Sequence, residues 1–315
     1  MLSPSCVIGI GFLGMALGIN GVLVGCWTDD EAATGVTVVL PPPGSLGAIA
    51  VRGGAPGTRE AAALGPTASG VECHGVVLCG NSVFGLAAAD GVTDWCVEQE
   101  RGLKLQAGIV PVVGAAVIYD LTSNDARRPG PKAGRLACDA AIEDDPPVGL
   151  NGVGRGCTVG KTCGREFASP GGQGVAVVKW GEVTVGVVVA VNAFGDVIDS
   201  DGSILAGCNA GSEALRYPYA SLSEINASES GEERTNTTIG CIVTNAILSK
   251  PEACRVSDMA HTGIARSIDP PHTSVDGDAL FILATQQVEA SVDLVSHLAA
   301  QAVAEAVRSP FVNMS

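Results

Sequence analysis

The residues best placed for chemistry lie where a polar segment meets an apolar one, at residues 235–246. Residues 221–234 are rich in Ser and Glu, a composition typical of an exposed loop. Ile239 to Val243 predicts a buried strand. Thr237 and Thr238 stand just before that apolar run, so the join offers a hydroxyl that a strand anchors and a loop that can be cut.

Other polar residues also follow apolar runs. Tyr119 and Asp120 end the Val- and Ile-rich run that begins at Leu105. Asn192 ends an apolar strand, where an amide can either close a turn or face a pocket. Asp276 and Asp278 form an acidic turn before the apolar strand 279–284.

Two other segments resemble functional motifs only in part. Residues 52–60 form a glycine-rich loop flanked by Arg52 and Arg59, which is either a tight turn or a cradle of backbone amides for an anion. The Lys-Ser/Thr ending of a phosphate-binding loop is missing. Ser82 does not fit the Gly-x-Ser-x-Gly nucleophile pattern, and we expect it to cap a helix.

Composition limits the classes of partner and site. The net charge of −15 argues against binding to nucleic acid or to anionic membranes. The 11 cysteines are scattered, mostly in apolar runs, which predicts free buried thiols and a reducing, cytoplasmic compartment; these runs hold Cys73, Cys79, Cys138, Cys208 and Cys241. The close pair Cys157 and Cys163 lacks a second ligand pair, so we expect no metal and no cofactor.

The first 18 residues are the one candidate targeting segment. The run Cys6 to Leu17 is apolar, but no Lys or Arg precedes it and glycines interrupt it. A core strand and turn, or an N-terminal extension, fits this pattern better than a signal peptide.

The remaining elements predict layered sheets with helices outside. Hairpins are expected at 21–27 with 35–40 and at 174–180 with 183–192, and helices over 258–268 and 288–307. The 42 glycines and the few aromatic residues imply closely packed layers. With neither an internal repeat nor a linker, residues 1–315 are expected to form one mixed α and β domain.

These segments together resemble the family of the L-aminopeptidase/D-esterase DmpA and the β-peptidyl aminopeptidases. The matching text is Thr34 to Leu40, Val51 to Glu60, Ser82 to Gly91, Val189 to Asp196, Asn236 to Gly240, Met259 to His261 and Asp276 to Asp278. The resemblance implies an α+β fold, a four-layer αββα sandwich. It also implies self-cleavage between Asn236 and Thr237 into chains 1–236 and 237–315, with Thr238 the alternative nucleophile one position later.

The resemblance assigns a role to each site residue. Thr237 would attack the carbonyl of Asn236, and water would open the resulting ester. The freed α-amine, with a pKa of about 7.7 to 8.0, would then serve as the general base without a histidine. Tyr119 and Asn192 match the oxyanion-stabilising positions, and Asp276 and Asp278 match a Ser and a Glu, so Asp276 is a departure from the family pattern.

The function expected from this resemblance is a self-processing aminopeptidase. It would remove the N-terminal residue of short peptides, amides or esters through an acyl-Thr237 intermediate, as a homo-oligomer without nucleic-acid or membrane partners. The alternative is an inactive relative that binds a small molecule or has a structural role, in which Thr237 only starts a strand.

Overall fold

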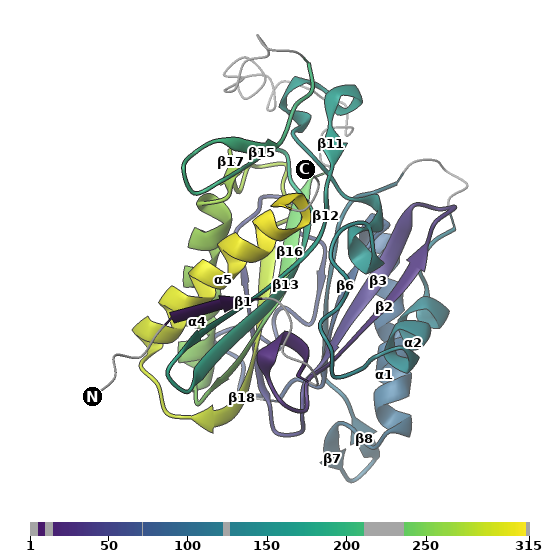
Figure 1. Cartoon of the computed structure of the whole chain (residues 1–315). Coiled ribbons are helices and arrows are strands. Elements are labelled where there is room, and N and C mark those ends of the chain that lie inside the picture. The colour runs from purple at the N-terminus through teal and green to yellow at the C-terminus, as the bar shows by residue number, and fades with distance from the viewer. Residues whose placement is uncertain (1–5, 10–14, 71, 122–126, 211–235, 313–315) are drawn as a thin grey trace.

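Two β-sheets lie face to face between two pairs of helices (Figure 1). The computed structural model describes residues 6–9, 15–70, 72–121, 127–210 and 236–312 of the chain. The α+β class and the αββα sandwich implied by the family resemblance are therefore confirmed. The expected exposed loop 221–234 lies outside the described residues.

The larger sheet has six strands and carries the predicted nucleophile. In spatial order the strands are β1 (Cys6–Gly9), β12 (Gly172–Trp180), β13 (Val183–Asn192), β16 (Thr237–Ala246), β18 (Ala279–Val288) and β4 (Leu46–Val51). Neighbouring strands are antiparallel except β16 and β18, which run parallel. The interior position of β16 explains why it is apolar over most of its length.

The smaller sheet has five strands. In order they are β2 (Leu23–Asp29), β3 (Thr34–Leu40), β6 (Gly75–Cys79), β9 (Val113–Val117) and β5 (Thr58–Arg59), with β6 and β9 parallel. Shorter paired strands complete the described β-structure: β7 (Leu103–Leu105) with β8 (Gly108–Val110), β10 (Thr158–Val159) with β11 (Ser169–Pro170), and β14 (Asp196–Ile198) with β15 (Ile204–Ala206) and β17 (Ile268–Asp269).

Helices cover the outer face of each sheet. Helices α4 (Lys250–Ala265) and α5 (Val292–Val312) pack on the six-stranded sheet, and α1 (Ala88–Glu98) and α2 (Pro131–Asp139) on the five-stranded one. Short 3-10 turns are η1 (Ala16–Gly18), η2 (Ser82–Ala87), η3 (Gly152–Gly156), η4 (Lys161–Cys163) and η5 (Arg165–Phe167). No helix in the described ranges combines the length and apolar character needed to span a membrane.

Strand periodicity divides the core into three layers. Along β13, Val187 and Val189 pack in the cluster with α4 and α5, whereas Val188 and Ala190 pack in the cluster between the sheets. A third cluster joins the five-stranded sheet to α1 and α2. Because successive strand residues face opposite sides, a strand buried on both faces must be apolar throughout.

Glycine allows these layers to approach closely, as the composition predicts. A Cβ at Gly174 on β12 would overlap the carbonyl oxygen of Ala306 on α5, and one at Gly134 on α2 would overlap that of Ala88 on α1. Both positions therefore need a residue without a side chain.

Several element predictions are confirmed and others are wrong. The two hairpins and the strand over 279–284 are present. The helix expected at 258–268 begins at Lys250, because Ser249 and Glu252 form a capping box, and it ends before Ile268, which lies in β17. The C-terminal helix begins at Val292, after β18 extends to Val288.

Ser82 does not cap a helix. Its backbone N–H donates to the carbonyl of Ile118 at 2.8 Å, and residues 82–87 form the 3-10 turn η2 before α1 begins at Ala88. The local sequence predicted a helix start correctly but placed it five residues early.

Candidate active site

Thr237 is the first residue of β16 and is buried. It pairs across the sheet with Asn192, the last residue of β13. The strand starts two residues before the predicted apolar run, so both Thr237 and Thr238 lie inside it. The register of β13 and β16 thus brings together a hydroxyl and an amide that are distant in sequence.

The peptide link before Thr237 has two hydrogen-bond donors on its carbonyl. The Thr237 hydroxyl donates to the carbonyl oxygen of Asn236, and the backbone N–H of Gly277 donates to the same oxygen at 2.9 Å. A Cβ at Gly277 would lie 2.9 Å from Thr237 Oγ1, so the acidic turn passes directly beside the hydroxyl. A backbone N–H on this oxygen polarises the carbonyl and stabilises negative charge that develops on it.

The two carboxylates of the acidic turn have different hydrogen-bond partners. Asp276 Oδ2 accepts from the Thr273 backbone N–H at 2.9 Å and from the Thr273 hydroxyl at 2.5 Å. Asp278 Oδ1 accepts from the Thr238 backbone N–H at 2.5 Å. Asp278 therefore fixes the start of β16, while Asp276 fixes the turn itself.

Burial and charge repulsion act together on Asp276. Removal from water and the neighbouring negative charge of Asp278 raise the pKa of Asp276 to about 6, against the lowering effect of its hydrogen bonds from Thr273 and Phe194. Its carboxyl thus changes charge just below neutral pH.

His272 contributes to the turn from the loop before it. Its Nδ1 lies 2.7 Å from Asp278 Oδ2, and its ring meets that of His261 edge-on with centroids 5.0 Å apart. His261 itself is buried in α4 with Nε2 3.1 Å from the carbonyl oxygen of Ala50. His272 thus contacts the Asp278 carboxylate from the loop that precedes the acidic turn.

The glycine-rich loop 52–60 supports the acidic turn and does not form an anion cradle through its first four amides. The backbone N–H groups of Arg52 and Gly53 donate to the carbonyl of Asp278 at 3.0 and 3.2 Å, and that of Ala55 donates to the carbonyl of Asp276 at 2.8 Å. A Cβ at Gly53 would overlap the backbone nitrogen of Asp278. Glycine is needed here because two backbone segments are in direct contact.

Asn192 links the nucleophile strand to Tyr119 and to a buried lysine. Its Nδ2 donates to the carbonyl of Tyr119 at 3.1 Å, while its Oδ1 accepts from Lys161 Nζ at 2.9 Å and from the Thr158 N–H at 3.0 Å. Lys161 Nζ also donates to the Asn192 backbone carbonyl at 2.9 Å. Asn192 therefore does more than close a turn, because its side chain contacts Tyr119, Lys161 and Thr158.

Lys161 is the residue that sequence reasoning missed. Burial is the main cause that lowers its pKa to about 7, and the positive charge of Arg165 adds to the effect, opposed by Cys157 and Asp276. An amine with this pKa can accept or release a proton near neutral pH. Its only sequence signal is its place in the glycine-rich segment 148–164, a composition that favours wrapping around a neighbour.

Tyr119 is held by the residue after it. Asp120 accepts from the Thr34 hydroxyl at 2.8 Å and from the Asn81 backbone N–H at 2.5 Å, which fixes the chain beyond β9. Arg165 lies over the Tyr119 ring at 5.2 Å. The structure therefore places Asn192 opposite Thr237, Asp276 opposite Asn236 and Asp278 on the N–H of Thr238. Tyr119 joins this group through its backbone carbonyl, which accepts from Asn192.

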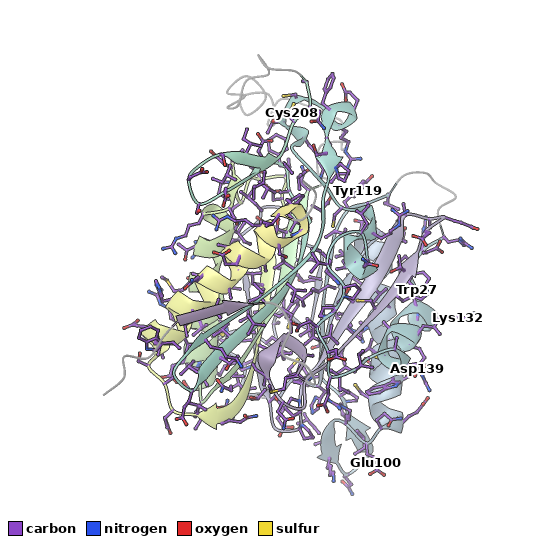
Figure 2. All side chains as sticks on the ribbon, viewed as in Figure 1. Trp27, Glu100, Tyr119, Lys132, Asp139 and Cys208 are labelled. Atoms are coloured by element: carbon purple, nitrogen blue, oxygen red, sulfur yellow. The ribbon has the colours of Figure 1, made fainter. Side chains whose placement is uncertain are left out.

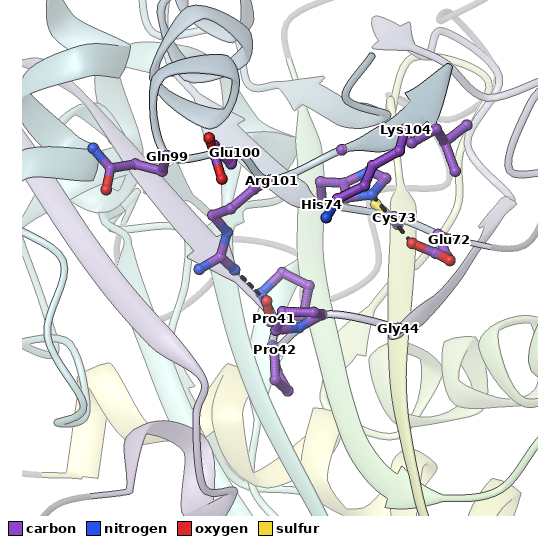
Figure 3. Close-up of a pocket in the computed structure, with 13 residues that line it drawn as sticks. Pro41, Pro42, Gly44, Glu72, Cys73, His74, Gln99, Glu100, Arg101 and Lys104 are labelled. Carbon is purple, nitrogen blue, oxygen red and sulfur yellow. Dashed lines mark hydrogen bonds and ion pairs between the residues drawn. The ribbon is translucent and has the colours of Figure 1, made fainter. Parts of the chain in front are cut away.

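A separate cavity of about 520 Å³ lies near the N-terminal ends of the parallel strands β6 and β9, away from Tyr119 (Figure 3). Its walls include His74, Arg101 and the Pro41 to Gly44 segment. Tyr119 follows the C-terminal end of β9, whereas His74 precedes the N-terminal end of β6. None of the predicted site residues lines this cavity.

The chain is similar to known proteins over most of its length. The model of peptidase family S58 matches residues 17–313. An uncharacterized aminopeptidase of Mycobacterium tuberculosis is 46% identical over 288 residues, covering 86% of this chain and 81% of that protein. A 6-aminohexanoate-oligomer endohydrolase of Paenarthrobacter ureafaciens is 32% identical over 275 residues, covering 85% of this chain and 74% of that protein.

Solved structures share the fold. The L-aminopeptidase D-Ala-esterase/amidase from Ochrobactrum anthropi, described as a variant of the Ntn hydrolase fold, superposes with a TM-score of 0.70 at 19% identity, covering 96% of this chain and 86% of that one. A Burkholderia β-aminopeptidase superposes with a TM-score of 0.71 at 17% identity, covering 96% and 88%. The family match over nearly the whole chain and the shared fold lead to one conclusion: this chain belongs to peptidase family S58.

Proposed function

We propose that this chain is a self-processing N-terminal-nucleophile aminopeptidase in which Thr237 is the nucleophile. The observation that carries the proposal is the contact of the Thr237 hydroxyl with the Asn236 carbonyl, whose oxygen also receives the Gly277 N–H at 2.9 Å. The carbonyl that the hydroxyl contacts and an N–H that can stabilise the developing oxyanion thus lie at the same peptide bond.

Self-cleavage proceeds through an ester. The Thr237 oxygen forms a bond to the Asn236 carbonyl carbon, the peptide C–N bond breaks, and the Thr237 nitrogen takes up a proton. Water then attacks the ester, which leaves a carboxylate on Asn236 and restores the Thr237 hydroxyl. The products are chains 1–236 and 237–315, and Thr237 gains a free α-amine.

The first step needs a base other than Thr237 itself. Before cleavage the Thr237 nitrogen is an amide and cannot accept a proton. Lys161 has a pKa near 7 and contacts Asn192, the strand partner of Thr237, so we assign proton uptake during self-cleavage to its amine. Asp276 and Asp278 hold the turn that presents Gly277.

After cleavage the α-amine becomes the base. Its pKa of about 7.7 to 8.0 suits proton transfer from the hydroxyl of the same residue. A substrate carbonyl then takes the place of the Asn236 carbonyl, and acyl-Thr237 forms and is hydrolysed. Asn192 and Tyr119 support the oxyanion, and the acidic turn attracts the free amino group of the substrate.

The relatives support amide hydrolysis as the reaction. They are named as aminopeptidases and as an endohydrolase of 6-aminohexanoate oligomers, all of which cleave amide bonds. We therefore expect short substrates with a free amino group, as amides, esters or small peptides of α- or β-amino acids.

Intact mass under denaturing conditions tests self-processing. Purified wild-type protein should give fragments 1–236 and 237–315, Thr237→Ala should stay as one chain, and the matched control Thr238→Ala should still be cut. A wild-type chain that stays whole after long incubation at neutral pH would favour the inactive alternative. Assaying the cleaved protein with amino-acid amides, in the presence and absence of an added amine, separates hydrolysis from acyl transfer.

A further inference from the structure

Two cysteines lie together beside the turn that carries Lys161. Cys163 ends η4, and Cys208 follows β15. Both are partly exposed, and the Cys163 thiol is close enough to Cys208 to contribute to the raised pKa of that thiol. Figure 2 shows Cys208 toward the end of the molecule where Tyr119 also lies. The sequence-based expectation that Cys208 is buried is therefore wrong, because β15 places it at the edge of the fold.

The backbone fixes this proximity. A Cβ at Gly160 would overlap the backbone of Gly207 and Cys208, so the two segments are in direct contact. Both are anchored to the chain after β13: the Gly160 N–H donates to Gly195 O at 2.9 Å, and the Cys208 N–H donates to Asp196 Oδ1 at 3.0 Å. The two cysteines thus lie in segments whose main chains are held side by side.

The other described cysteines differ in accessibility or in partner. Six are fully buried, namely Cys73, Cys79, Cys96, Cys138, Cys157 and Cys241. The two remaining partly exposed thiols contact other groups: Cys26 contacts Thr37 and Gln173, and Cys254 donates to the carbonyl of Leu64. Among the cysteines whose side chains the structure describes, Cys163 and Cys208 are partly exposed and interact with each other.

We propose that Cys163 and Cys208 form a reversible disulfide when the protein meets a peroxide, and that this bond slows the Thr237 site through the Lys161 turn. Neighbouring, accessible thiols are the arrangement on which an oxidised cysteine is resolved by its partner.

The reaction balances with one peroxide for each pair. The Cys163 thiolate attacks a peroxide oxygen, forms a sulfenic acid and releases hydroxide. The Cys208 sulfur then attacks the sulfenic sulfur, the S–S bond forms and a second hydroxide leaves. Two thiol protons convert these hydroxides to water, so two electrons pass from the thiols to the peroxide.

The effect on the site follows from geometry. Lys161 and Cys163 belong to the same single turn, and Lys161 Nζ holds Asn192 Oδ1 at 2.9 Å. A disulfide needs an S–S separation of about 2.05 Å, closer than two sulfur atoms that are not bonded, so the turn must shift. Misplacement of a positioning group by about 1 Å can slow catalysis by about 100-fold.

Peptide mapping tests the bond independently of any activity. The full-length protein is treated with hydrogen peroxide, blocked with iodoacetamide and digested with trypsin. Peptide 162–165 contains only Cys163, and peptide 180–216 contains only Cys208. We expect these two peptides to be disulfide-linked and to separate in dithiothreitol, with no link in Cys163→Ser or Cys208→Ser and a retained link in Cys254→Ser.

Recovery of both peptides alkylated, or linked to other peptides, would overturn the proposal. The activity arm rests on the proposed function: peroxide should slow amide hydrolysis by at least threefold in the wild type, reversibly, and should leave Cys163→Ser unaffected. A linked protein with unchanged hydrolysis would refute the coupling to Lys161. If the protein hydrolyses no amide at all, the proposed function fails while the peptide map still decides the disulfide.

Discussion

Two buried lysines lie at opposite ends of the six-stranded sheet and have different surroundings. Lys161 donates to Asn192 beside the first residue of β16, whereas Lys250 donates to the carbonyl of Gly47 at 2.6 Å at the start of β4. Gly47 pairs with Leu283 near the far end of β18. Burial lowers the pKa of both amines.

The difference shows that burial alone does not make a functional lysine. Lys250 satisfies a backbone carbonyl next to the capped start of α4, where its neighbours Cys73 and Cys254 are thiols. Lys161 contacts a side chain paired with the proposed nucleophile and lies near both Arg165 and Asp276. We therefore expect Lys250 to stabilise the fold and Lys161 to take part in proton transfer.

Replacing each lysine by methionine should give the largest contrast. Lys161→Met removes the assigned base and the hydrogen bonds to Asn192, so self-cleavage should slow by at least about 100-fold. Lys250→Met should keep its rate within about twofold, because it touches no site group. Timed intact-mass measurements give both rates, and circular dichroism checks that both variants are folded. Equal loss in the two variants would remove the distinction.

The next largest effect is expected from the glycine that supports the acidic turn. In Gly53→Ala the new Cβ would overlap the Asp278 backbone nitrogen, so the turn that carries the Gly277 N–H must shift relative to Asn236. Self-cleavage should slow by at least about tenfold. The control is Gly70→Ala, whose Cβ would meet no atom within 4 Å. A rate in Gly53→Ala equal to that of Gly70→Ala would argue against a role for the turn.

The pH dependence of self-cleavage should show the lowered pKa of Lys161. Its amine must be neutral to accept a proton, so the rate should fall as pH drops below about 7, by about tenfold per unit. Protonation of Asp276 near pH 6 adds a further loss. Intact-mass analysis of quenched time points, from pH 8 downward, gives the dependence of the cleavage rate on pH. Lys250→Met should show the same dependence. A rate that stays constant down to pH 5.5 would contradict the assignment.

The smallest effect is expected on stability at the other lysine. Lys250→Met leaves the Gly47 carbonyl without its 2.6 Å hydrogen bond, which should lower the free energy of unfolding by about 1 kcal/mol. Urea denaturation followed by circular dichroism measures this change on the Thr237→Ala background, where the chain is expected to stay whole. Unchanged or increased stability would show that the amine costs as much to bury as its hydrogen bond returns.

Sequence patterns predicted much of the site because its residues stand at strand ends. Apolar runs mark where β13 ends at Asn192 and where β18 begins after Asp278. Pairing of β13 with β16 then places Asn192 opposite Thr237. Lys161 could not be found this way, because only the tertiary fold brings η4, which precedes β12 in the chain, onto Asn192 at the end of β13.

Two further misses have different causes. The start of α4 was readable from the capping box of Ser249 and Glu252, so that error came from an overlooked local signal. The contact of Cys163 with Cys208 and the support of Asp278 by residues 52–53 are tertiary contacts between irregular segments, for which hydrophobic periodicity carries no information.

N-terminal sequencing of the small fragment tests the central claim most directly. If Thr237 attacks the Asn236 carbonyl, the fragment begins Thr-Thr-Ile-Gly, with Thr237 carrying the free α-amine. A fragment that begins Thr-Ile-Gly would move the nucleophile to Thr238, whose N–H instead donates to Asp278. That start, or the absence of any small fragment, would contradict the account.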